Sequence, residues 1–204
     1  MDKLLIILLT MYLGKNILNV LNVLGGTGNV VTFACSGADP NIRLSSMGRV
    51  TITSTKNGQT VKYTYSNLNN TNINVQSDAN SAITISGGLT YIQSQDAIHF
   101  AAAGNRTLQD IRFSSSLLSL HLENCTALKV LRLGNTNNLT DITVTRCPAI
   151  DSLFIGNSTN EVANAAIQIM ADNAANQGSV FMMYADSYYT DVQNAANASG
   201  WHVS

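Results

Sequence analysis

The sequence has few charged residues, few prolines and few cysteines, and these shortages exclude several classes of protein. Asp, Glu, Lys and Arg make up 11% of the 204 residues, against about 25% in a typical soluble domain. Eleven Lys and Arg against twelve Asp and Glu leave a net charge of −1. This balance excludes a nucleic-acid binder that depends on clustered basic side chains. Because 45% of the residues are hydrophobic, generic disorder is excluded as well.

Cysteine usage is equally uninformative about metal or redox chemistry. The chain has three cysteines and no C-x-x-C pair, so neither a disulfide framework nor a metal or redox motif is indicated. We therefore expect no cofactor and no metal site. The polar residues that replace charge are Asn, of which there are 24, together with Ser and Thr. A near-neutral surface has little charge repulsion between copies, which favours assembly into something larger.

Residues 4–24 form the most apolar stretch of the chain. Its length permits a membrane span, but Lys15 and three asparagines in its second half make that interpretation unfavourable. No A-x-A-like cleavage site follows closely, which argues against a secretory signal peptide. Two interpretations remain, a helix packed in the core of the following domain and an assembly helix, and we favour the second. The helical stripe that it would bury against copies of itself or against a partner is Leu4, Ile7, Met11, Leu18 and Leu21.

After the glycine run at 25–28, alternation with a period of two predicts a β-rich domain over residues 27–104, which leaves 1–26 as the assembly segment. Asn57-Gly58 lies between two alternating runs and predicts a hairpin over residues 49–66. Four apolar pairs after it each predict a brief strand: Ile73 and Val75, Ile83 and Ile85, Tyr91 and Ile92, and Ile98 and Phe100.

A repeat with a period of 11 residues follows, and it is the most specific signal in the sequence. Its pattern is L-x-x-L-x-L-x-x-[C/T/S], with a shifted copy at Leu108, Ile111, Phe113 and Ser116. The four aligned units begin at Leu117, Leu128, Leu139 and Ile150 and end at Cys125, Thr136, Cys147 and Ser158.

This spacing predicts a β-solenoid over residues 105–160. In each L-x-L the two leucine positions point inward and the residue between them points outward, as in a strand. Eleven residues make a half-coil, so strands 22 residues apart stack at about 4.8 Å and bury each other's apolar faces. Cys125 and Cys147 are 22 residues apart, so they would lie one above the other, either as a disulfide or as buried reduced thiols.

The pattern resembles the leucine-rich repeat, in the doubled 11-residue form found in surface proteins of gut Bacteroidetes and in their phages. The resemblance covers about residues 105–158. The position usually held by Asn is occupied by Cys125, Thr136, Cys147 and Ser158. The resemblance implies a protein that binds partners or builds structures.

The outward positions of the predicted strands give two candidate binding faces. One face stacks His121 and Thr143, with Ser119 and Asp141 beside them, and the other stacks Arg112, Arg132 and Phe154. The second face suits an anion or a sugar ring, although an ordinary solvated strand face explains both sets equally simply.

The remaining residues, 161–204, predict an α/β cap that covers the open end of the solenoid. Helical spacing over 161–176 and 187–198 flanks an apolar strand at 179–184. The ending Gly200-Trp201-His202-Val203 is similar to the GW-x-V close seen after such repeats.

We expect no enzymatic activity, because no catalytic motif is present and His99, His121 and His202 lie in different segments. The fold class we predict is mainly β with helices. The predicted function is that of a structural or adhesive protein in a bacteriophage virion, as a head or tail fibre or a decoration protein, which docks or self-associates through residues 1–24 and has a possible host receptor or glycan as its target. The alternative is a bacterial surface or secreted protein that binds a host protein or glycan.

Overall fold

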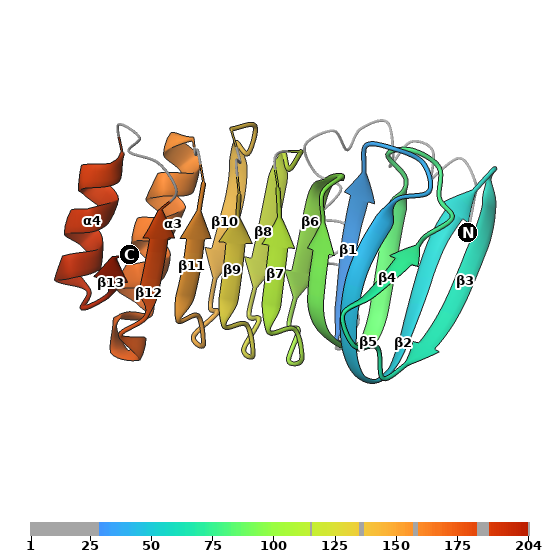
Figure 1. Cartoon of the computed structure of the whole chain (residues 1–204), viewed down its shortest axis with the longest axis horizontal. Coiled ribbons are helices and arrows are strands. Elements are labelled where there is room, and N and C mark those ends of the chain that lie inside the picture. Colours follow the sequence, from blue (N-terminus) through green and yellow to red (C-terminus); the bar gives the residue numbers. More distant parts are fainter. Residues whose placement is uncertain (1–28, 115, 135–136, 157–158, 183–187, 204) are drawn as a thin grey trace.

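The computed structural model describes residues 29–114, 116–134, 137–156, 159–182 and 188–203. The chain is mainly β, with one mixed sheet of 13 strands and two α-helices near the C-terminus of the described part. Seven of the strand pairs are parallel and five are antiparallel. Figure 1 shows the strands arranged side by side along the long axis, from β2 and β3 at one end to α4 at the other. The mainly β prediction is confirmed at this level.

The N-terminal strands are long and mostly antiparallel. Strand β2 pairs with β3, β4 and β5, and β1 lies between β5 and β6 and pairs with both. All five antiparallel pairs of the sheet fall in this part of the chain. The strands are β1 (Val30–Cys35), β2 (Asn41–Lys56), β3 (Gln59–Ser66), β4 (Thr71–Asn74), β5 (Ala82–Ser94) and β6 (Ala97–Ala103).

The hairpin predicted over residues 49–66 is confirmed. Strands β2 and β3 pair in register from Arg49 opposite Ser66 to Lys56 opposite Gln59. Asn57 and Gly58 form the turn with φ angles of 51° and 73°. Both angles are positive, as a two-residue type I′ turn requires.

Two of the predicted brief strands are wrong, because they belong to one strand. Ile83 and Ile92 both lie in β5, which runs for 13 residues through Gly87-Gly88. The register between β2 and β5 shifts between Ser46 and Val50, where β2 bulges. A bulge absorbs the irregularity without ending the pairing, and a Cβ at Gly88 would fall onto the carbonyl oxygen of Met47. The glycines that suggested a break are therefore what allows the strand to continue.

The later strands form two parallel rows. The first row is β5-β7-β9-β11-β12-β13 and the second is β6-β8-β10, and β1 joins the two rows between β5 and β6. Within each row consecutive strands are parallel. The strands are β7 (Asp110–Phe113), β8 (Ser119–Glu123), β9 (Val130–Leu133), β10 (Asp141–Thr145), β11 (Ser152–Ile155), β12 (Ser179–Met182) and β13 (His202–Val203).

The pairing register follows the 11-residue repeat. Leu131 of β9 lies opposite Leu153 of β11, and Leu120 of β8 lies opposite Ile142 of β10, so paired strands are 22 residues apart. The inward leucines are buried, with Leu120 fully buried and Leu131 1% exposed. Each row thus buries the same apolar positions strand after strand, which is how neighbouring repeats stabilise each other.

The C-terminal residues form the two helices and two strands that the spacing predicts. Helix α3 (Asn160–Asp172) begins after Thr159, whose Oγ1 accepts from the backbone N–H of Val162 at 3.3 Å. It packs against β10 and α4 (Tyr189–Ala198), so helix replaces strand at the end of the second row. A 3₁₀ turn (Ala174–Asn176) follows α3. Buried Trp201 donates its Nε1–H to the carbonyl oxygen of Asn173 at 3.3 Å, which ties the chain end to this cap.

One hydrophobic core extends through all of these elements. It includes Phe33 and Ile85 of the antiparallel strands, Leu131 of the repeats, and Met170 and Trp201 of the cap. The sheet also crosses the predicted boundary at residue 104, since β5 pairs with β7 and β6 pairs with β8. The division into segments 27–104, 105–160 and 161–204 stays a prediction.

Candidate functional site

The outward side chains of the first row line up across five strands. Gln93 of β5 lies opposite Arg112 of β7, Arg112 opposite Arg132 of β9, Arg132 opposite Phe154 of β11, and Phe154 opposite Phe181 of β12. We call these five residues the outer ladder. Parallel strands in register place equivalent side chains about 4.8 Å apart, so the ladder is a continuous ridge on one face.

Aromatic and guanidinium groups contact each other along the ladder. The Arg132 guanidinium lies 5.5 Å from the centroid of the Phe154 ring, within the range of a cation–π contact. The Phe154 and Phe181 rings stack with centroids 4.6 Å apart and an interplanar angle of 18°. Phe181 is 40% exposed, so the ladder ends in an aromatic surface that solvent reaches.

The two arginines of the ladder have different partners. Arg112 makes a two-pronged ion pair with Asp110, with Nε–Oδ1 at 3.1 Å and Nη2–Oδ2 at 2.7 Å. These hydrogen bonds raise the pKa of Arg112, and its guanidinium lies 5.2 Å from the centroid of the Tyr91 ring. Within the described ranges no acidic side chain pairs with Arg132, and its Nε is buried without a hydrogen-bond partner. Arg132 is therefore the arginine available to a ligand.

The second row brings together a cluster of polar side chains. His99 of β6 lies opposite Ser119, which lies opposite Asp141, and His121 lies opposite Thr143. His99 Nδ1 is 2.7 Å from Ser119 Oγ, and His121 Nε2 is 3.1 Å from Asp141 Oδ2. The His121 contact is an ion-pair approach without hydrogen-bond alignment. Burial lowers the pKa of His99, against the opposing charge of Asp141.

This cluster has the residue types of a hydrolytic triad but not its connections. A triad needs one histidine that contacts both the nucleophile and the acid. Here Ser119 contacts His99, whereas Asp141 contacts His121. Ser119 is also only 5% exposed. The contacts instead link three neighbouring strands on the outer face of the second row.

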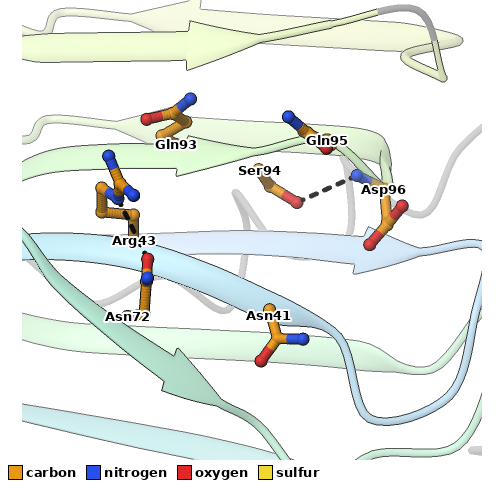
Figure 2. Close-up of a pocket in the computed structure, with 7 residues that line it drawn as sticks. All are labelled: Asn41, Arg43, Asn72, Gln93, Ser94, Gln95 and Asp96. Carbon is orange, nitrogen blue, oxygen red and sulfur yellow. Dashed lines mark hydrogen bonds between the residues drawn. The ribbon is translucent and has the colours of Figure 1, made fainter.

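Two cavities lie on the outer face of the sheet where the antiparallel strands meet the repeats. The first has a volume of about 380 Å³ and extends from Arg43 and Gln93 to the turn after β5. Figure 2 shows Arg43, Asn72 and Gln93 at one end of it and Gln95 and Asp96 toward the other. The second cavity, of about 390 Å³, shares Arg43 and Gln93 and extends to β7. It is lined by Arg43, Ser45, Asn70, Thr90, Tyr91, Gln93, Gln109, Asp110 and Arg112.

The three cysteines are free and buried. Cys125 Sγ lies 3.5 Å from the carbonyl oxygen of Ala102, and Cys147 Sγ lies 3.4 Å from that of Thr145. The hydrogen bond with Cys147 and burial raise the pKa of Cys125. Both side chains point inward to loop backbone groups, as the repeat predicts, while Thr136 and Ser158 lie outside the described residues.

The structure keeps the two predicted faces apart. Arg112, Arg132 and Phe154 adjoin in the first row, and His121 and Thr143 adjoin in the second, so the five residues do not form one surface. The predicted assembly helix lies outside the described residues. In the described ranges no group of three or more His, Cys, Asp or Glu side chains is placed to hold a metal ion.

Sequence reasoning missed the polar cavities. Asn41, Arg43 and Asn72 come from strands without a repeat, so no spacing marks them. Gln93 carried a usable signal, because Ile92 continues the inward column of Ile111 and Leu131. Extending the repeat backward by one strand places Gln93 in the outward column with Arg112.

Comparison with protein-family models finds no matching family, and comparisons with curated proteins and with solved structures find no match either. Among the residues that the structure describes, no helix is both long enough and apolar enough to cross a membrane.

Proposed function

We propose that this chain is a non-catalytic structural and adhesive protein whose repeat region is a leucine-rich-repeat-like solenoid with an α/β cap. In this proposal residues 1–24 dock the protein into an assembly of its own copies or of partner proteins. The repeat region then presents its outer face to solvent. The setting we favour is a bacteriophage virion, as a head or tail fibre or a decoration protein.

The observation that carries the proposal is the separation of roles along the parallel strands. On β9, Leu131 and Leu133 point into the core with 1% and 3% exposure, while Arg132 between them faces outward in the ladder. The same alternation recurs on β7 and β11. The inward positions hold the fold, so the outward positions are free to vary and to bind.

Asn105 supports the likeness to leucine-rich repeats. It precedes Leu108 by three residues, as Cys125 precedes Leu128. Asn105 is fully buried, and its Oδ1 accepts from the backbone N–H groups of Thr107 at 3.0 Å and Leu108 at 2.8 Å. An inward Asn that caps loop amides is the side chain that the repeat pattern usually has at this position.

The assembly role is tested by native mass spectrometry of the full-length chain and two variants. Met11→Asp places a charge in the predicted apolar stripe, and Asn19→Asp places the same charge on the polar face of the same helix. We expect an oligomer from the natural sequence and from Asn19→Asp, and a 21.8 kDa monomer from Met11→Asp. A monomer from all three proteins contradicts assembly through residues 1–24.

The second candidate, a bacterial surface or secreted protein that binds a host protein or glycan, is favoured by the two polar cavities. It differs from the first in what residues 1–24 do, because they would then serve export. The amino terminus of the protein recovered from the cells that make it separates the two. A terminus cleaved after the apolar stretch supports export, and an intact one supports the assembly role.

A further inference from the structure

The two polar cavities adjoin, since Arg43 and Gln93 line both of them. We propose that together they form one groove that binds an uncharged oligosaccharide. This inference rests on the proposed adhesive function and names the ligand class of that function. Each cavity has a volume near the lower end of the range of about 300–1,000 Å³ seen for small-molecule sites.

The lining groups suit hydroxyl-rich ligands. Carboxamide side chains recur along the groove, and each can donate and accept hydrogen bonds, as a sugar hydroxyl does. The other lining groups add two guanidinium groups, two carboxylates and small hydroxyls. The carboxamides are Asn41, Asn70, Asn72, Gln93, Gln95 and Gln109.

Several of these groups are already held in place. Tyr91 donates its O–H to Gln93 Oε1 at 2.6 Å, which leaves the Gln93 amide N–H groups for a ligand. Arg43 Nε donates to Asn72 Oδ1 at 3.0 Å, as Figure 2 shows. Arg112 is held between Asp110 and the Tyr91 ring. Side chains ordered before binding lose less entropy when the ligand arrives, which favours recognition by this groove.

Charge and polarity narrow the ligand class. The lining contains two arginines, Arg43 and Arg112, and two aspartates, Asp96 and Asp110, so its formal charges cancel. A net-neutral groove does not favour an anionic ligand. No aliphatic side chain lines either cavity, whereas a peptide partner is held by apolar anchors in pockets. An uncharged saccharide remains the ligand class that the lining best matches.

The proposal is tested by affinity electrophoresis of the full-length protein through native gels. Four gels contain neutral polysaccharides, namely mannan, dextran, xylan and mixed-linkage β-glucan, and one contains polygalacturonate. We expect retardation in at least one neutral gel. Gln93→Ala removes a ligand-facing amide shared by both cavities and should weaken retardation about fivefold or more, and Tyr91→Phe, which releases Gln93, should weaken it less.

Gln59→Ala is the matched control, because Gln59 is exposed on β3 and lines neither cavity. Circular dichroism and the melting temperature confirm that each variant is folded. Unretarded migration in all four neutral gels overturns the proposal, as does retardation by polygalacturonate alone or retardation that Gln93→Ala leaves unchanged. None of these outcomes alters the oligomer mass, so failure here is distinguishable from failure of the assembly role.

Discussion

The antiparallel strands at the N-terminal end and the parallel strands of the repeats share one core but differ in length and in what they present. Strands β2 and β5 have 16 and 13 residues, whereas β7, β9 and β11 have four each. A four-residue strand has room for only two outward side chains. The long strands carry polar side chains well beyond that width, and the groove lies where β2 and β5 meet β7.

The contrast shows how one sheet can divide its tasks. The repeats reuse one pattern of inward leucines, which makes an extended and regular face. The antiparallel strands lack the repeat, and their bulges and long edges make a local, irregular site. Strand β5 belongs to both parts, because it pairs with β2 and β1 on one side of the comparison and with β7 on the other.

The largest expected effects come from removing core side chains in each region. Ile85 of β5 is fully buried and Leu131 of β9 is 1% exposed. We expect Ile85→Ala and Leu131→Ala each to lower the free energy of unfolding by about 2–5 kcal/mol. Arg132→Ala, one residue from Leu131 but outward, should cost less than about 1 kcal/mol.

Urea unfolding followed by two probes measures these changes. Circular dichroism reports on the whole sheet, and the fluorescence of Trp201, the single tryptophan, reports on the cap. Because the core is continuous, we expect both probes to shift together in both core variants. A shift in circular dichroism without a shift in Trp201 fluorescence for Ile85→Ala would show that the two regions unfold as separate domains.

Glycine substitutions should be unequal between the regions. A Cβ at Gly88 of β5 would collide with the backbone of Met47, whereas a Cβ at Gly134, after β9, would meet only the carbonyl oxygen of Phe113 at 3.8 Å. We expect Gly88→Ala to lower the free energy of unfolding by about 1–3 kcal/mol and Gly134→Ala to stay within about 0.5 kcal/mol of the natural protein. Equal urea midpoints for the two variants would contradict the close approach of β2 and β5.

The smallest effect should be the pH dependence contributed by His99. Burial lowers the pKa of His99 below the value of 6.5 for an unperturbed imidazole, so the unfolded chain binds this proton more readily than the folded one. Its contribution to stability is therefore complete above that value and is lost as the pH falls through it. The facing groups are Asp141, which opposes the shift, and His121, which adds to it.

We expect His99→Gln to reduce the loss of stability between pH 7.5 and pH 5, measured as the shift in urea midpoint. His202→Gln is the control, because His202 is exposed in the cap. If both variants keep the pH slope of the natural protein, the buried imidazole of His99 does not contribute to it.

The repeats were far more predictable than the antiparallel strands, for a physical reason. Their pairing is set by a fixed spacing, so the alignment of Leu131 with Leu153 and of Arg132 with Phe154 follows from the sequence alone. The hairpin at Asn57-Gly58 was also predictable, because its turn is local. The insertion of β1 between β5 and β6 was not, since it depends on contacts between residues about 50 to 70 apart in the chain without a periodic signal.

The candidate sites follow the same division. Arg112, Arg132 and Phe154 were found because they occupy equivalent places in the repeat. The groove was missed because Arg43, Asn72 and Gln93 come from three strands brought together only by the antiparallel pairings of β2. Polar side chains at such a junction carry no pattern in the sequence, although they are the residues that give the site its chemistry.

The central claim is that the outer face of the first row stays accessible when the protein assembles. It is tested most directly by the rate of maleimide labelling of Ser152→Cys, a near-isosteric change on β11 that leaves the outer ladder intact, with the natural protein and its buried cysteines as background. The account predicts rates within about twofold in the assembled protein and in the same protein carrying Met11→Asp. Labelling that is at least about tenfold slower in the assembled protein would contradict it, because the face would then be buried in the assembly.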